Sequence, residues 1–568
     1  MSFDTIIKGG TVVDGSGLPM RNADVGIKDG MITDVGRLSH ARHTIDADGL
    51  IVMPGIVDAH THYDPQLTFD PFATSSCFHG VTSVVGGNCG YSIAPVKPAD
   101  RKWVTKLFAK VEGMTPSVLD EGLPWDWDTF PKLLDVLDKR LGINAAVYVG
   151  HSALRRWVMG EAASERKATP QEIEKMKVLV REAMASGAAG FSSSHAPTHT
   201  DHQGRPVPSR HAEFDEVLAL AATAGEGGAG SIAFLAATAV QGYDAADRER
   251  LIQLAHASGL PVVVQGMGYR PGAKDRWDDQ VSFLDAARDR GAAIYSMLRT
   301  QPMMRPFTWK RGTSLFDGVF HWRELNDLPA DERLARLRNP SLRAKLRAGI
   351  DKPNTDPKQG STLPMPAMAT LFVDKSATDP GAVGKSVAQL AKERNVHPAD
   401  VLAELGAAGD GTTQFMWNTE TPAWIEANAE SQRNVHMIVG TGDGGAHADR
   451  DDGAEWSTYY LRSWLLDRKL FTLEEGVRRI THLPAAVCGI ERRGLIARGY
   501  HADVMMFDPT RIGLGKKALV ADMPGGEERW QVGAEGIVRV IVNGRTIVEN
   551  NQLTGVRPGR VLRIGNAA

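Results

Sequence analysis

An apolar run ends in two histidines at Ile51-Val52-Met53-Pro54-Gly55-Ile56-Val57-Asp58-Ala59-His60-Thr61-His62. The run is typical of a buried strand. Because side chains alternate along a strand with a period of two, His60 and His62 are expected to project from the same face. In a parallel α/β barrel the carboxyl ends of the strands form the catalytic face, so this pair would point into the barrel mouth. Zinc binds imidazole readily, and the stretch therefore predicts a metal site.

A second motif lies near the end of the chain, at Gly442-Asp443-Gly444-Gly445-Ala446-His447, just after the strand-like segment 436–440. Glycines on both sides of Asp443 let the backbone pass close to a ligand. The carboxylate can bind a metal ion and accept a proton from an attacking water, although an Asp in such a sequence can also simply form a turn. His447 could donate to a tetrahedral oxyanion or a leaving group, or only cap the next segment.

Short apolar runs alternate with helical stretches through the middle of the chain, which favours a (β/α)8 TIM barrel. With the opening run, the strand candidates are 81–85, 145–149, 188–191, 230–235, 260–265, 292–297 and 436–440. Thr169-Pro170-Gln171-Glu172 is typical of a helix start, with a Thr cap and Pro at the first position. Two long segments, 97–140 and 300–430, interrupt the alternation and are expected to be functional lids, extra subdomains or packing insertions.

Composition excludes several classes of protein. The 568 residues carry a net charge of -3, which gives no basic footprint for nucleic acid. No stretch supplies the roughly 20 apolar residues of a membrane helix, and the amino terminus has no signal-peptide pattern. Three dispersed cysteines do not make a disulfide framework. We expect a cytoplasmic enzyme that acts on a small molecule, without nucleic-acid or membrane partners, and that forms a homo-oligomer.

The opening motif, together with 80–90, 150–155 and 494–503, resembles the amidohydrolase superfamily. Within it, the chain is similar to the N-acyl-D-amino-acid deacylase (D-aminoacylase-like) branch. The resemblance implies a barrel domain over 55–487 and a small β-sandwich built from both chain ends, 1–54 and 488–568. Both ends read as short strands, such as 4–8 and 11–14, and a β piece of about 50 residues cannot bury much core alone.

The resemblance also implies a thiolate ligand at Cys89, although a lone cysteine is otherwise most often a small buried apolar residue. It further implies histidines at the ends of the fifth and sixth barrel strands, yet neither 232–235 nor 262–265 contains one. A replacement ligand is expected from the histidine-rich loop 194–202, where we favour His199 over His195 and His202; an ordinary polar loop is an equally open interpretation. His60, His62, Asp443 and Cys89 or His199 would then hold zinc, as one ion or two, with manganese, cobalt or iron as alternatives.

Five further residues are expected to contact substrate. Arg155 and Arg210 could each bind a carboxylate bidentately, or could be ordinary surface arginines. The other candidates are His151, Ser193 and His195.

The leading hypothesis is a metal-dependent amidohydrolase, acting on carbon–nitrogen bonds other than peptide bonds, that cleaves an N-acyl amino acid or a similar small amide. Asp443 would serve as general base and then general acid. One alternative moves the same chemistry to a lactone, carbamate, cyclic amide or bulky hydrophobic amide. Another is a metal-free binding or scaffold protein.

Overall fold

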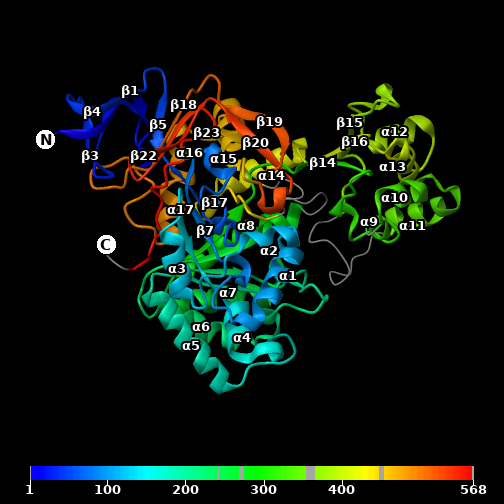
Figure 1. Ribbon diagram of the computed structural model, residues 1–568, viewed down its shortest axis with the longest axis horizontal. Helices are drawn as coiled ribbons and strands as arrows, with labels where there is room; N and C mark the ends of the chain where they lie inside the picture. The colour runs from blue at the N-terminus through cyan, green and yellow to red at the C-terminus, as the bar shows by residue number, and fades with distance from the viewer. Residues whose placement is uncertain are drawn as a thin grey trace. The chain divides into compact units, whose positions relative to one another are not determined.

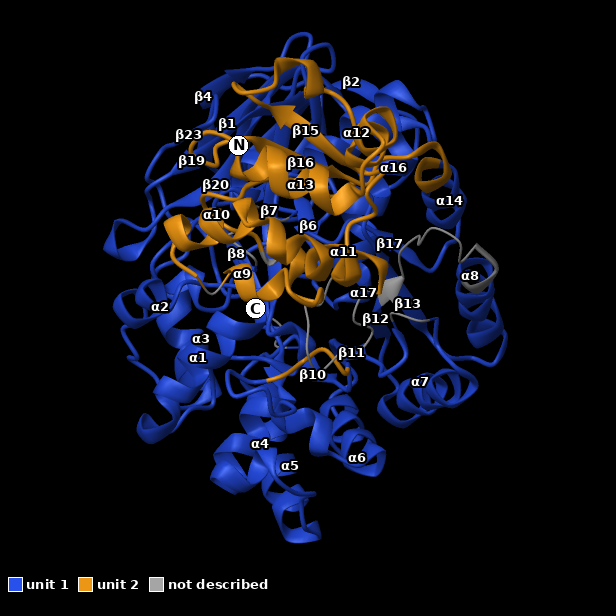
Figure 2. Cartoon of the chain, turned by 90° about the vertical axis from the view of Figure 1, so that its right-hand side faces the viewer, with its two compact units in different colours: residues 1–196, 201–301, 426–568 blue, residues 197–200, 302–425 orange. Residues whose placement is uncertain are grey.

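The computed structural model describes residues 2–239, 242–267, 274–326, 328–352, 365–446 and 453–565. The chain forms two compact units, which Figure 2 distinguishes by colour. The first comprises 1–196, 201–301 and 426–568, and the second comprises 197–200 and 302–425.

A parallel barrel forms the centre of the first unit (Figure 1). Its strands, in order, are β6 (Ile56–Asp58), β7 (Val81–Gly86), β8 (Asn144–Val147), β9 (Val149–Gly150), β10 (Gly190–Ser194), β11 (Ser231–Leu235), β12 (Val262–Met267), β13 (Ile294–Leu298) and β17 (Met437–Val439). β8 and β9 are two halves of one barrel position, because β8 pairs with β7 and β9 pairs with β10. A parallel bridge between Thr61 and Gly444 joins the first strand to the last. The predicted TIM barrel is confirmed.

Helices cover the outside of this barrel, namely α4 (His151–Met159), α5 (Pro170–Ala185), α6 (Phe214–Gly225), α7 (Ala245–Ser258) and α8 (Lys274–Asp289). Helix α5 begins as its sequence predicted, since the Thr169 side chain and Glu172 form a reciprocal capping box. Inside the barrel, small and branched side chains such as Val57, Ala146 and Val263 are buried in one cluster. The barrel is therefore a packed core whose polar residues gather at the strand ends.

A nine-stranded sheet joins the two ends of the chain. It contains β1 (Phe3–Val12), β2 (Arg21–Lys28), β3 (Met31–Gly36), β4 (Ala41–Asp46), β5 (Ile51–Pro54), β18 (Val504–Phe507), β21 (Ile537–Val542), β22 (Arg545–Glu549) and β23 (Gln552–Leu553). Strand β5 pairs in parallel with β1 on one side and antiparallel with β18 on the other. A separate two-stranded sheet contains β19 (Gly513–Val520) and β20 (Arg529–Glu535).

Two local predictions differ from the structure, and one strand carried no prediction. The opening apolar run is not one strand: it divides at Gly55 into β5 of the nine-stranded sheet and β6 of the barrel. The predicted strands 4–8 and 11–14 are one strand, because β1 continues through Gly9-Gly10 with a shift in register. Strand β4 had no prediction, since its exposed polar residues give no clear alternation.

The 97–140 segment belongs to the first unit as three helices, α1 (Arg101–Val111), α2 (Pro116–Gly122) and α3 (Phe130–Asp138). The second unit contains most of the 300–430 segment and has its own core. There, an antiparallel sheet of β14 (Met304–Thr308), β16 (Gln414–Asn418) and β15 (Leu371–Lys375) accompanies helices α9 (Arg323–Asn326), α10 (Ala330–Arg338), α11 (Arg343–Asp351), α12 (Val387–Arg394) and α13 (Pro398–Ala407). The buried rings of Trp309, Phe316 and Trp322 pack on one another.

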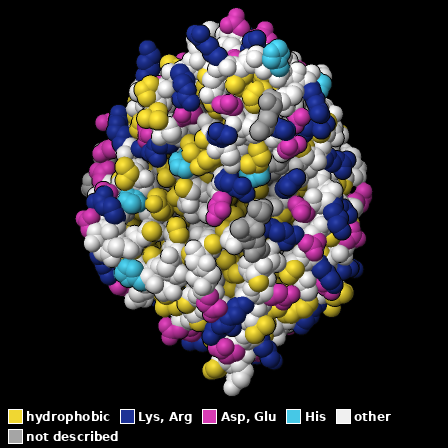
Figure 3. Space-filling view, turned by 90° about the vertical axis from the view of Figure 1, so that its left-hand side faces the viewer, with side chains coloured by type: hydrophobic (Ala, Val, Ile, Leu, Met, Phe, Trp, Pro, Cys, Tyr) yellow, Lys and Arg dark blue, Asp and Glu magenta, His cyan; other side chains and the backbone are white. Residues whose placement is uncertain are grey.

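No helix in the described part of the chain is long and apolar enough to cross a membrane. On the face shown in Figure 3, basic and acidic side chains are interspersed. This mixed distribution agrees with the small net charge and gives that face no extended basic surface for a polyanion.

Candidate metal centre

Four side chains from three strand ends converge in the first unit. The candidate ligand atoms of His60, His62 and Cys89 all lie within 4.8 Å of one another. Oδ1 of Asp443 lies 3.5 Å from Nε2 of His60 and 3.5 Å from Nε2 of His62. Both histidine side chains are almost fully buried, whereas 26% of the Asp443 side chain is exposed. Asp443 is therefore the group of this centre that solvent reaches most easily.

Backbone hydrogen bonds hold the two motifs together. The amide of His62 donates to the oxygen of Gly444 at 2.8 Å, and the amide of Asp443 donates to the oxygen of His60 at 3.0 Å. Together with the parallel bridge between Thr61 and Gly444, these contacts join the segments that directly follow β6 and β17. The register between the first and last strand ends therefore fixes the histidines against the carboxylate.

The Asp58 carboxylate binds the same two chain segments to each other. Its Oδ1 accepts hydrogen bonds from the amides of His60 and Gly442, each at 3.2 Å, and its Oδ2 accepts one from Trp456 Nε1 at 2.9 Å. Burial raises the pKa of Asp58 to about 6, and the three hydrogen bonds oppose that rise. A Cβ at Gly442 would lie 1.7 Å from Asp58 Oδ2, so this close approach requires glycine.

Cys89 lies in a tight loop after β7. Gly87, Cys89 and Gly90 all have positive φ angles, of 74°, 57° and 77°. The hydroxyl of Ser192, on β10, accepts a hydrogen bond from the Gly90 amide at 3.1 Å and donates to the oxygen of Gly87. Burial raises the pKa of the Cys89 thiol well above its ordinary value, and the carboxylates of Glu112 and Asp443 raise it further. A cation at the centre would favour the thiolate instead.

Both imidazoles also have a partner at Nδ1. The Gln265 amide nitrogen lies 2.6 Å from Nδ1 of His60, and Glu112 Oε1 lies 3.4 Å from Nδ1 of His62. With Nδ1 engaged, each ring turns Nε2 toward Asp443. Such outer partners fix the tautomer and orientation of a metal-binding histidine.

Sequence reasoning missed the roles of Gln265 and Glu112. Gln265 lies on β12, within the strand end that was noted only for its lack of histidine. Glu112 directly follows α1 in the 97–140 segment, where no local pattern marks it. The position of Gln265 at a strand end is a signal that the sequence offers. Glu112 has no such signal, because only the folded chain brings it to His62, 50 residues earlier in the sequence.

The donor set fits a zinc ion. Two imidazole nitrogens, one sulfur and one carboxylate oxygen are ligands that zinc accepts in a tetrahedral site. Thiolate and imidazole together also argue against magnesium or calcium, which prefer oxygen ligands.

Two predicted site residues, His447 and His199, stay predictions. His447 lies outside the described residues. His199 belongs to the segment 197–200, which groups with the second unit.

Three of the expected substrate contacts form a buried network instead. Both ring nitrogens of His151 are hydrogen-bonded: Nδ1 lies 2.8 Å from Ser193 Oγ, and Nε2 lies 2.9 Å from Glu216 Oε1. Arg155 Nη1 lies 2.6 Å from both carboxylate oxygens of Glu216, and neither side chain is exposed by more than 2%. The guanidinium is therefore already paired in the interior, and this placement contradicts the expected substrate clamp at Arg155.

His195 and Arg210 are less enclosed. His195 follows β10 and packs its ring edge-to-face against Phe234 at 5.4 Å, and burial lowers its pKa to about 4. Arg210 is half-buried, and partial burial lowers its pKa while nearby Tyr91 opposes that shift. Of the five expected substrate contacts, these two retain some exposure to solvent.

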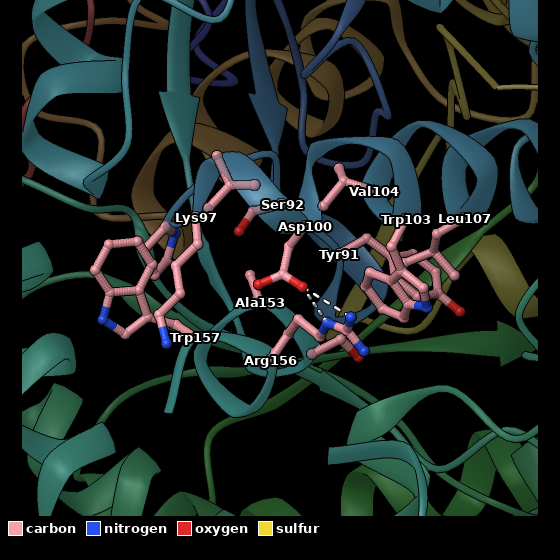
Figure 4. A pocket seen from close by; sticks show the side chains of 13 residues that line it. Tyr91, Ser92, Lys97, Asp100, Trp103, Val104, Leu107, Ala153, Arg156 and Trp157 are labelled. Atoms are coloured by element: carbon pink, nitrogen blue, oxygen red, sulfur yellow. Dashed lines mark hydrogen bonds and ion pairs between the residues drawn. The ribbon is translucent and has the colours of Figure 1, made fainter. Parts of the chain in front are cut away.

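A small pocket borders the loop that carries Cys89. Tyr91, Trp103, Arg156 and Trp157 are among its lining residues, and Figure 4 shows Arg156 bound to Asp100 at its edge. Its cavity volume of about 10 Å³ leaves room for about one water molecule. This pocket is therefore too small to be the substrate site.

Comparisons with known proteins agree with this architecture. The model of the amidohydrolase family matches residues 43–385 and 442–548. D-aminoacylase of Alcaligenes xylosoxydans xylosoxydans is 29% identical, with 99% of this chain and 97% of that protein covered. N-acyl-D-aspartate deacylase of the same organism is 28% identical, with 99% and 96% covered.

A solved structure of D-aminoacylase has a TM-score of 0.62 with this chain. That structure concerns the functional role of the binuclear metal centre in D-aminoacylase, with one-metal activation and second-metal attenuation. It is 27% identical and covers 99% of both chains. The family match spans most of the sequence and includes His60, His62, Cys89 and Asp443. The chain therefore belongs to the amidohydrolase family and is a hydrolase that acts on carbon–nitrogen bonds other than peptide bonds.

Proposed function

We propose that this chain is a zinc-dependent deacylase that hydrolyses the amide bond of N-acyl amino acids, with D-amino acids as the first class to test. The observation that carries the proposal is the convergence of both histidine Nε2 atoms on Asp443 Oδ1. The relatives named D-aminoacylase and N-acyl-D-aspartate deacylase support the substrate class.

The chain supplies ligands and a proton carrier. His60, His62 and Cys89 would hold the ion, with Asp443 at its solvent side. A bound zinc ion would polarise the amide carbonyl and lower the pKa of the attacking water. Asp443 would accept the proton of that water at Oδ1 and later deliver it to the departing amine nitrogen. Its partial exposure allows it to reach both partners.

One ion per chain is the expected stoichiometry. The fifth- and sixth-strand ends, 231–235 and 262–265, contain no histidine for a second ion. The side chain of Gln265 on the sixth strand is instead engaged with His60. A single ion with protein ligands and water suffices for hydrolysis.

Activity and metal content of the purified protein test the proposal. We expect about one zinc ion per chain after preparation without chelator, and hydrolysis of N-acetyl-D-amino acids in preference to L-enantiomers, lactones and carbamates. Asp443→Asn should lower kcat by about 100- to 10,000-fold, because the general base is lost. A chain that binds no zinc, or an Asp443→Asn variant with full activity, would contradict the proposal.

A further inference from the structure

One carboxamide contacts two of the candidate ligands. The Nε2 atom of Gln265 lies 2.6 Å from His60 Nδ1, and its Oε1 lies 3.6 Å from Cys89 Sγ. The Tyr243 hydroxyl donates a hydrogen bond to the backbone oxygen of Gln265, which fixes this strand end. His60 and Cys89 come from loops after β6 and β7, and Gln265 comes from β12. The side chain therefore connects three strand ends of the barrel.

The hydrogen-bonding needs of the two ligands are opposite. An imidazole that binds a cation through Nε2 carries its proton on Nδ1 and needs an acceptor there. A thiolate has no proton and is stabilised by a donor. A carboxamide has one acceptor and one donor on the same planar group, and its two orientations have nearly the same shape. When both ligands bind a cation, the carboxamide can therefore take the orientation opposite to the one described above. Gln265 then offers its oxygen to His60 and its amino group to Cys89.

Other side chains of similar size cannot meet both needs. A glutamate would accept from His60 but would place a negative charge against the sulfur, and a leucine would satisfy neither ligand. The carboxamide thus suits a site that combines one imidazole and one thiolate on the same ion.

We propose that Gln265 is a positioning residue that orients His60 and Cys89 toward a single metal ion. The inference rests on the proposed function, because it needs a metal at this centre. It assigns to Gln265 a task different from direct ligation: the residue organises two ligands that come from separate loops.

Cadmium titration tests this role without measuring activity, because cadmium–thiolate bonding gives an ultraviolet charge-transfer band. Cys89→Ala in the full chain assigns the band to this sulfur. We expect Gln265→Leu to weaken cadmium binding by about 10- to 100-fold, as loss of such outer partners does, and to reduce the band. Gln253→Leu, at an exposed position of α7, is the matched control and should behave as wild type.

Gln265→Glu separates the two contacts. It keeps the acceptor for His60 and repels the thiolate, so we expect cadmium to remain bound while the charge-transfer band falls. This variant also tests the inference if Gln265→Leu does not fold, as judged by circular dichroism. Wild-type affinity and band intensity in Gln265→Leu, or an undiminished band in Gln265→Glu, would overturn the role of Gln265 alone. A wild-type chain that binds no cadmium would overturn the proposed function as well.

Discussion

Asp58 contributes no ligand atom to the candidate metal centre, yet its carboxylate joins the two chain segments that do. It accepts hydrogen bonds from the His60 amide, the Gly442 amide and the Trp456 indole. All three donors are buried, so water could not replace the carboxylate as their hydrogen-bond partner if it were removed. At the scale of single residues, the geometry of the centre therefore depends on side chains behind it as much as on the ligands.

Asp58→Ala should weaken zinc binding by about 10- to 100-fold, because the backbone of His60 and the segment before Asp443 lose their common anchor. The change should also lower the free energy of unfolding by about 1–3 kcal/mol for each buried donor left unpaired. Zinc affinity by chelator competition and chemical unfolding measure the two effects. Asp58→Asn keeps one acceptor oxygen and should lie between wild type and Asp58→Ala; equal zinc affinity in all three proteins would refute this role.

At the scale of secondary-structure elements, a buried ion pair joins helices α4 and α6. Arg155 and His151 lie on α4 and Glu216 lies on α6, and Ser193 on β10 extends the network. Burial would raise the pKa of Glu216, but His151 and Arg155 lower it below its ordinary value. Burial lowers the pKa of His151 despite its bond to Glu216. This network holds the α4 and α6 helices against β10, whose Ser192 hydrogen-bonds the Cys89 loop.

Glu216→Gln should lower the free energy of unfolding by about 3–5 kcal/mol, because it leaves the Arg155 guanidinium buried without its counter-ion. The control is Glu226→Gln, which breaks an exposed pair with Arg181 and should cost no more than about 1 kcal/mol. Chemical unfolding of both variants checks the difference. Equal losses would show that the buried pair has no special role.

The same network predicts how stability depends on pH. His151 titrates near 6.5 and Glu216 near 4.5 when unfolded, and both pKa values are lower in the folded protein. The unfolded chain therefore binds more protons on acidification, so stability should fall as the pH drops below about 6.5, with the Glu216 contribution lost below about 4.5. Chemical unfolding of wild type and Glu216→Gln across acidic pH measures this loss of stability. If the stability of the variant fell as steeply as that of wild type below about pH 4.5, Glu216 would make no such contribution.

At the scale of the whole molecule, the sheet built from both chain ends makes distant segments depend on each other. Val52 on β5 pairs with Met506 on β18, and both side chains are fully buried. After β5 ends at Pro54, the chain passes through Gly55 directly into β6, the barrel strand that precedes His60. The amino-terminal sheet is therefore connected directly to the barrel strand that presents the histidines.

Met506→Ala should lower the free energy of unfolding by about 2–5 kcal/mol, since it opens a cavity at the centre of this sheet. The matched change Met20→Ala, at a side chain 49% exposed, should alter stability by no more than about 0.5 kcal/mol. Chemical denaturation of both variants gives the comparison. A small effect at Met506 would indicate that the two chain ends do not share one core.

The sequence predicted the barrel and the ends of its strands well because alternating apolar runs and punctuating glycines are local signals. It also singled out His60, His62 and Asp443, which the fold brings together, because each follows a strand-like run. Cys89, which joins them, was expected only from the family resemblance. The division at Gly55 was missed because both halves are equally apolar and only the sheet each joins distinguishes them. The Arg155 pairing was missed because its partner, Glu216, lies on another helix and no local pattern connects them.

The most direct measurement is the anomalous scattering of zinc in crystals grown without chelator. We expect one strong peak per chain about 2.0–2.3 Å from His60 Nε2, His62 Nε2 and Cys89 Sγ, with Asp443 at its solvent side. A zinc-replete crystal with no peak there, or with these side chains directed to different surfaces, would contradict it.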